Sequence, residues 1–173
     1  MSKNTNWSID SAHSEIAFKV KHMMISTVTG YFEDFEATAK TDGDDFSNAE
    51  IEFSAKTKSI NTKNKDRDTH LKSDDFFNAE KFPEMKFVSK SFNGNKLLGD
   101  LTIRDVCKEI TLDVEFNGIA VDTYGQTKAG FEIRGEINRK DFHLTWSAVT
   151  EAGNIVVSDK VKLVIDVQFI KQA

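Results

Sequence analysis

Residues 110–117 read ITLDVEFN, with an apolar residue at every second position and a polar residue after each one. Successive side chains of a β-strand point to opposite faces of the sheet, so this period of two predicts a strand with one buried and one solvated face. The segments 14–22, 51–56, 131–137 and 161–169 show the same alternation. The pattern therefore predicts an extended sheet with one apolar side.

Shorter stretches bring the expected number of strands to about eight. These stretches are 31–41, 85–92 and 96–103. Asp-Gly or Asn-Gly pairs follow three of the expected strands and favour tight reversals. Because almost no helix-length segment lies between the strands, parallel crossovers are disfavoured. Eight long antiparallel strands could form a sandwich, but we expect a closed barrel, filled by side chains or holding one small ligand.

Residues 61–81 interrupt the alternation and predict one or two short helical turns. This segment is rich in ionisable residues, and its densest run contains Asp66, Arg67, Asp68 and His70. On a helix Arg67 and His70 would share a face, and Asp66 would lie within hydrogen-bonding reach of His70. This face could meet a polar or anionic headgroup, although a solvated surface turn explains the same residues. A second interruption, 147–154, is expected to be a loop or short helix.

His22 continues the inward series of its expected strand, so we expect it to point toward the interior. It is either a headgroup donor or a histidine with a purely structural role. The four histidines have no metal-ligand spacing, and no Gly-x-Ser-x-Gly motif or phosphate-binding loop is present. The sequence therefore predicts no catalytic residue and no metal site.

Length and composition indicate one globular domain spanning residues 1–173, with 39% hydrophobic and 29% charged residues. A net charge of -5 argues against nucleic acid or an anionic membrane as the main partner. The 14 phenylalanines, against two tryptophans and two tyrosines, suit an interior without hydrogen-bonding groups. Cys107 is the single cysteine, and no secretory signal or membrane-spanning stretch is evident. We therefore expect a cytoplasmic protein without stable membrane insertion.

Several sequence blocks resemble the YceI-like family of lipocalin-like, polyisoprenoid-binding proteins. The blocks are WSIDSAHS at 7–14 with its continuation to His22, SINT at 59–62, RDxHLxSxDFF at 67–77, FPxMxF at 82–87, GxLTI at 99–103 and RxDFxLxW at 139–146. They occur in the family's order across nearly the whole chain. This resemblance implies an all-β, extended eight-stranded antiparallel lipocalin-like barrel with one or two short helices.

The resemblance also implies that the barrel holds a long-chain lipid of isoprenoid, quinone or fatty acyl type, with no other cofactor and a possible homodimer. By analogy with the family, four residues would lie near the lipid headgroup: His22, Arg67, Asp68 and His70. Residues of the expected inner face would line the tail: Ile16, Phe18, Val20, Phe53, Phe87, Leu112, Val114, Phe131, Ile133, Trp146, Leu163 and Ile165. We therefore expect non-enzymatic binding, storage or transport of the lipid.

Two other functions remain open at this point. A hydrolase or isomerase could use His22 or His70 with Asp68, and a filled barrel could act as a protein-interaction module. The chain also departs from the family pattern at one rim. Asp105 and Glu109 stand where the family has glycine and proline, and His143 stands where it has glycine, so this rim is expected to differ in shape or ligand preference.

Overall fold

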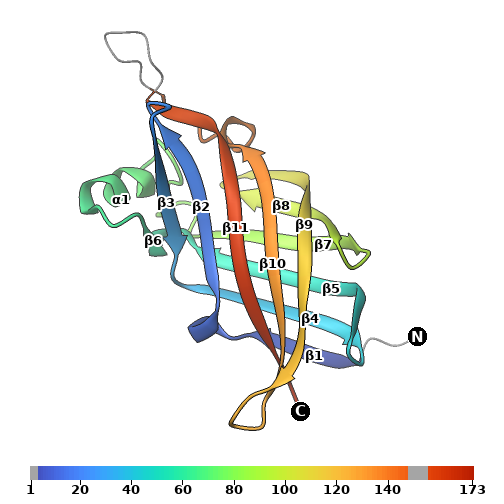
Figure 1. The fold of residues 1–173 in the computed structure, drawn as a ribbon. Helices are drawn as coiled ribbons and strands as arrows, with labels where there is room; N and C mark the ends of the chain where they lie inside the picture. Colours follow the sequence, from blue (N-terminus) through green and yellow to red (C-terminus); the bar gives the residue numbers. More distant parts are fainter. Residues whose placement is uncertain (1–3, 148–155) are drawn as a thin grey trace.

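The computed structural model describes residues 4–147 and 156–173 (Figure 1). The expected connection at 147–154 lies outside these residues, apart from Ser147. The strands are β1 (Thr5–Ile9), β2 (Glu15–His22), β3 (Ser26–Phe32), β4 (Phe35–Asp42), β5 (Asp45–Lys56), β6 (Ile60–Asn61), β7 (Glu84–Phe92), β8 (Lys96–Ile103), β9 (Val106–Val121), β10 (Thr127–Asn138) and β11 (Val157–Lys171). The helical elements are α1 (Lys65–Lys72) and the 3-10 turns η1 (Ser11–His13), η2 (Thr57–Ser59) and η3 (Arg139–Phe142).

Within the described ranges, eight strands close into an antiparallel ring in the order β1-β4-β5-β7-β8-β9-β10-β11, with β11 pairing back to β1. The strand β11 also pairs with β2, which continues β1 along the same edge, and β3 and β6 follow β2. Figure 1 shows β2, β11, β10 and β9 side by side across one wall, with α1 on the flank near β6. The predicted eight-stranded barrel with a short helix is confirmed. No helix in the described part of the chain is long and apolar enough to cross a membrane.

Alternation correctly predicts the inner face of β9 until the barrel wall ends. Leu112 and Val114 are buried, with 5% and 8% of their surface exposed, whereas Phe116 is 46% exposed. The strand β8 pairs with β9 only as far as Asp113. Phe116 therefore lies on the inward face of β9, but beyond the point where β8 ends. The expectation that this face of the strand is buried along its whole length was wrong at Phe116.

Asp10 holds the break between β1 and β2. One carboxylate oxygen accepts the Ala12 backbone N–H at 3.2 Å, and the other accepts Lys128 Nζ at 2.8 Å. His13 Nδ1 lies 2.8 Å from the same oxygen as Lys128. The hydrogen bond from Lys128 lowers the pKa of the Asp10 carboxyl, against the opposing effect of its burial. The strand β11 pairs with β1 on one side of this break and with β2 on the other. The ion pair between Asp10 and Lys128 therefore links the break to β10.

We expect Asp10→Asn to lower the free energy of unfolding by about 1 kcal/mol at neutral pH, because asparagine keeps the turn but loses the ion pair. A carboxyl whose pKa falls on folding stabilises the fold above its ordinary pKa, here 3.8, and loses that effect as the pH drops through the folded value. The difference between variant and wild type should therefore vanish in acid. Urea unfolding at a series of pH values measures it, with the exposed Asp141→Asn as control. A difference that persists unchanged in acid would contradict the assignment.

Candidate functional site

The barrel encloses a cavity of about 200 Å³ whose lining is apolar except for Arg139. Eleven of the twelve side chains predicted to line a ligand tail border this cavity: Ile16, Phe18, Val20, Phe53, Phe87, Leu112, Val114, Phe131, Ile133, Leu163 and Ile165. The twelfth, Trp146, lies at a second cavity described below. Each of the eleven belongs to a strand whose two faces differ in polarity, so alternation predicts that its side chain points into the barrel.

Ten of the 14 phenylalanines border the cavity, including several that the sequence analysis did not assign. The additional ones are Phe32, Phe46, Phe76, Phe77, Phe92 and Phe169. Phe76 and Phe77 come from the connection after α1 rather than from a strand, so strand periodicity does not identify them. The signal that could have identified them is a pair of aromatic residues inside an otherwise charged segment.

Two glycines on the barrel wall leave room for phenylalanine rings on the neighbouring strands. A Cβ atom at Gly30 would approach the Phe18 ring to 2.3 Å, and one at Gly99 would approach the Phe87 ring to 2.4 Å. Both distances are far shorter than a van der Waals contact, so the rings occupy the space that a side chain would need. Each ring therefore packs over the backbone of the neighbouring strand.

An aromatic cluster packs at the end of the cavity near β1. The Phe46 ring lies 4.8 Å from the rings of both Trp7 and Phe131, and Phe131 lies 6.2 Å from Phe169. Trp7 is 1% exposed and donates its indole N–H to Thr41 Oγ1 at 2.8 Å. A buried indole needs such an acceptor, so the hydrogen bond fixes the ring that closes this end.

A second cavity of about 370 Å³ adjoins the first near the start of β11 and shares five lining residues with it. The shared residues are Phe18, Val20, Leu71, Phe76 and Val157. Val28 and Val156 add to this apolar part, and polar and amphipathic side chains complete the lining: Lys21, His22, Thr62, Asp66, Arg67, His70 and Trp146. We call this second cavity the mouth. Three of the four predicted headgroup residues line it, and His22 is exposed there rather than directed into the barrel.

His70 sits between the polar and apolar parts of the mouth. Its Nε2 atom lies 2.8 Å from Asp75 Oδ2. The edge-on ring contacts of His70 lie at 4.8 Å to Trp146 and 5.1 Å to Phe76. Asp75, rather than the expected Asp66, is therefore the carboxylate partner. The helix spacing was read correctly, but the loop after α1 folds back and brings Asp75 closer.

Arg67 and Asp68 both hold Thr62, which is 4% exposed. The Arg67 Nε atom donates to Thr62 Oγ1 at 2.8 Å, and its Nη2 donates to the Thr62 carbonyl at 2.6 Å. The Asp68 carboxylate accepts both the Thr62 backbone N–H and its hydroxyl. Asp68 borders neither cavity. It fixes the connection that presents Arg67, and does not itself face the space where a headgroup would lie.

Arg139 is a buried cation that borders the barrel cavity and joins three segments beside the mouth, and strand alternation assigns it no role. It is 3% exposed, and its Nη1 donates to the carbonyls of Leu144 and Trp146, both at 2.6 Å. Its Nε donates to the Ser158 carbonyl at 3.0 Å. Burial lowers the pKa of the guanidinium, and the nearby Asp159 carboxylate partly offsets this. Arg139 thereby ties the segment carrying Trp146 to the start of β11.

At the rim that departs from the family pattern, two of the departing residues, Asp105 and His143, lie close together. His143 has a φ of 62°, in the left-handed region where glycine is favoured, which explains why glycine suits this position. Its Nδ1 atom lies 3.4 Å from Asp105 Oδ1. The substituted residues face one another across the η3 turn and the β8–β9 turn.

A comparison with protein-family models matches residues 7–169 to the YceI-like domain. The chain belongs to the YceI-like family. Among YceI-like relatives, a UPF0312 protein of Staphylococcus aureus (strain MSSA476) is 39% identical over 166 residues, which cover 95% of this chain and 97% of that protein. A Campylobacter jejuni YceI protein of known crystal structure has 37% sequence identity to this chain. The two structures superpose with a TM-score of 0.75, and the match covers 88% of this chain and 90% of that one.

A more distant structure shares the YceI-like fold. A polyisoprenoid binding domain from Saccharophagus degradans is 15% identical and has a TM-score of 0.74, covering 96% of this chain and 98% of that one. At this level of identity the likeness concerns the arrangement of the strands. It agrees with the closed barrel seen here.

Proposed function

We propose that this YceI-like protein binds one long apolar molecule with a polar end and carries it without chemical conversion. The observation that carries the proposal is the pairing of an apolar cavity with an adjoining polar mouth. Burying each CH₂ group contributes roughly 0.8 kcal/mol, so a chain of ten or more methylenes supplies a large driving force in an apolar cavity. A few polar groups at one end then suffice to orient the molecule.

The mouth favours a headgroup that accepts hydrogen bonds. Lys21, His22, Arg67 and His70 can donate there, while Asp66 is the acidic residue in its lining. A hydroxyl, carbonyl or carboxylate oxygen on the ligand would suit these donors. The description of the Saccharophagus degradans domain as polyisoprenoid binding supports an isoprenoid chain among such ligands.

The geometry favours carriage over the two other functions that the sequence left open. Asp68 binds Thr62, and His70 pairs with Asp75, so the expected Asp68–His70 catalytic pair is not assembled. The cavity within the barrel likewise argues against a barrel filled by its own side chains. Carriage needs neither a nucleophile nor a general base.

Retinol, an isoprenoid alcohol whose fluorescence rises in an apolar environment, provides a direct test. We expect protein purified without detergent to bind one retinol per chain, as measured by fluorescence titration and native mass spectrometry. Saturated primary alcohols of increasing length should displace it, with affinity rising about fourfold per added CH₂ until the cavity is filled. An alcohol affinity that does not depend on chain length, or no uptake of any isoprenoid or acyl ligand, would refute the proposal.

A further inference from the structure

The turn between β2 and β3 adopts a conformation that its residues disfavour. Met23 and Met24 have φ angles of 51° and 60°, and the Ile25 N–H donates to the His22 carbonyl at 3.1 Å. Positive φ at both central residues is the pattern of hairpin turns that usually carry Asn-Gly, because a Cβ atom is strained there. Methionine at both positions breaks this local preference. Such strain is typically retained where the side chains serve a function.

The same turn holds apolar side chains out in water. Met24 is 63% exposed and Ile25 is 79% exposed. The residue before the turn, His22, lines the mouth, and the Met23 N–H donates to the carbonyl of Val156 at 2.9 Å. Val156 also lines the mouth. We call Met23–Ile25 the tip. It stands beside the opening through which a ligand would pass, at the end of the barrel where β11 starts (Figure 1).

The charge of the hairpin that carries the tip differs from that of the whole chain. In this hairpin, Glu15–Phe32, the single acidic residue is Glu15 at the end of β2 away from the tip, and two lysines and one histidine lie between Glu15 and the tip, although the chain carries a net charge of -5. An apolar tip on a cationic hairpin matches the order of groups at a bilayer surface, where acyl chains lie beneath phosphate headgroups.

We propose that the tip contacts a phospholipid bilayer while the ligand passes through the mouth. This inference rests on the proposed carriage of a water-insoluble molecule, which must leave and enter membranes. The contact is shallow and transient, because three side chains bury little area. The overall negative charge weakens attraction to a membrane at a distance, so the local hairpin determines which end of the barrel approaches.

Vesicles made from equal parts of phosphatidylcholine and phosphatidylglycerol test the contact with and without retinol. Flotation with empty vesicles measures membrane contact alone. The rate at which retinol moves from vesicles to protein measures transfer, and its dependence on vesicle concentration separates transfer by collision from transfer through water. Titration of retinol without vesicles measures the carriage function independently.

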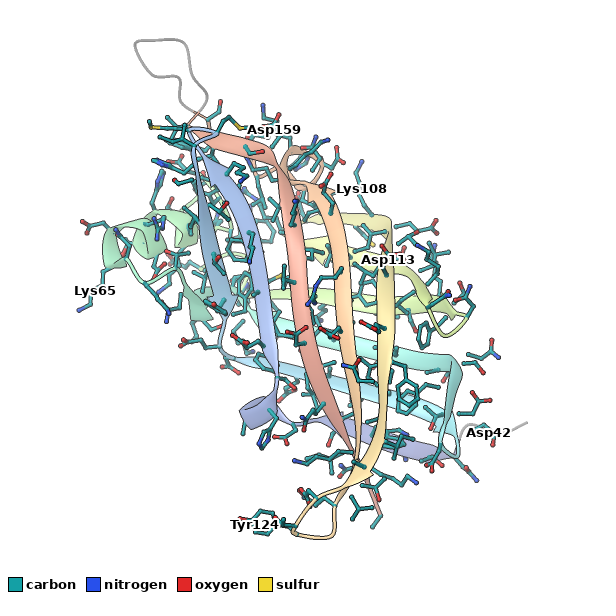
Figure 2. All side chains as sticks on the ribbon, in the orientation of Figure 1. Asp42, Lys65, Lys108, Asp113, Tyr124 and Asp159 are labelled. Atoms are coloured by element: carbon teal, nitrogen blue, oxygen red, sulfur yellow. The ribbon has the colours of Figure 1, made fainter. Side chains whose placement is uncertain are left out.

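Two tip variants and one control test whether the tip contacts the bilayer. We expect Met24→Ser with Ile25→Ser to reduce both flotation and transfer rate about tenfold or more, leaving retinol affinity unchanged. Met23→Asn with Met24→Gly should also slow transfer, while making the protein more resistant to urea because the turn strain is relieved. The control is Val121→Ser with Tyr124→Ser, which removes side chains that are 67% and 89% exposed. Figure 2 shows Tyr124 at the end of the barrel opposite Asp159, and the control should transfer retinol at the wild-type rate.

The outcomes separate the two proposals. If the tip variants float and transfer like wild type, or if the control slows as much as they do, the tip assignment is wrong. Flotation gives this answer even without ligand. If wild-type protein binds neither retinol nor another isoprenoid or acyl ligand in the titration, carriage fails whatever the tip does.

Discussion

Arg139→Met is expected to lower the free energy of unfolding by about 3–5 kcal/mol. Methionine fills a similar volume but donates no hydrogen bond, so the carbonyls of Leu144, Trp146 and Ser158 lose the donor that holds them. Buried carbonyls without a partner are strongly destabilising. Urea unfolding monitored by tryptophan fluorescence measures the change, and Trp146 makes the signal sensitive to the mouth.

The neighbouring Lys140 offers a matched control. It is a cation on the same turn and lies 3.4 Å from the Asp159 carboxylate that also lies near Arg139, but it is 45% exposed. Lys140→Met should change stability by about 0.5 kcal/mol or less, since exposed ion pairs contribute little. Arg139→Lys should resemble Arg139→Met, because one ammonium cannot reach carbonyls on three sides. Equal effects of Arg139→Met and Lys140→Met would show that the buried contacts contribute no more than surface charge.

Phe131→Lys is expected to weaken retinol binding about a hundredfold or more. The Phe131 side chain is 5% exposed, and its ring lies 4.8 Å from Phe46 and 5.2 Å from Phe116. A lysine there either places an ammonium in the apolar cavity or leaves a hole in the aromatic cluster, and either change opposes burial of an apolar chain. Fluorescence titration with retinol measures the loss.

Two further variants separate a binding defect from a folding defect. Glu132→Lys introduces the same side chain one residue along β10, at a position that is 42% exposed and on the opposite face. It should bind retinol like wild type. Ile133→Lys places the charge at another cavity-lining position that is only partly buried, so it should fold more readily and still lose binding. Normal binding by a folded Ile133→Lys would show that this face does not line the ligand.

The lining of the cavity could be predicted from sequence because strand geometry is a local property. In β2, β5, β7, β9, β10 and β11 alternating polarity indicates which side chains face inward, and eleven of the twelve chosen residues border the cavity. Two residues that depart from this pattern have physical reasons. Phe116 lies beyond the end of its neighbouring strand, and Trp146 belongs to a segment without alternation, positioned by Arg139.

The partners of the charged residues could not be predicted in the same way. Helix spacing suggested Asp66 for His70, whereas chain reversal after α1 supplies Asp75. Asp68 was placed with the headgroup by analogy, and it holds Thr62 instead. The backbone strain at Met23 and Met24 could not be predicted either, because the sequence does not indicate which type of turn joins β2 and β3.

The long antiparallel strands and their apolar inner face follow from the amino-acid sequence, because the period of two acts between neighbouring residues. The three-dimensional fold was needed to establish that the ring closes and keeps a cavity, that its mouth lies between α1, β2 and the start of β11, and that a buried arginine joins the segments beside that mouth. Cavities and hydrogen bonds between distant segments depend on strand register and chain reversals, which are fixed when all the strands close together.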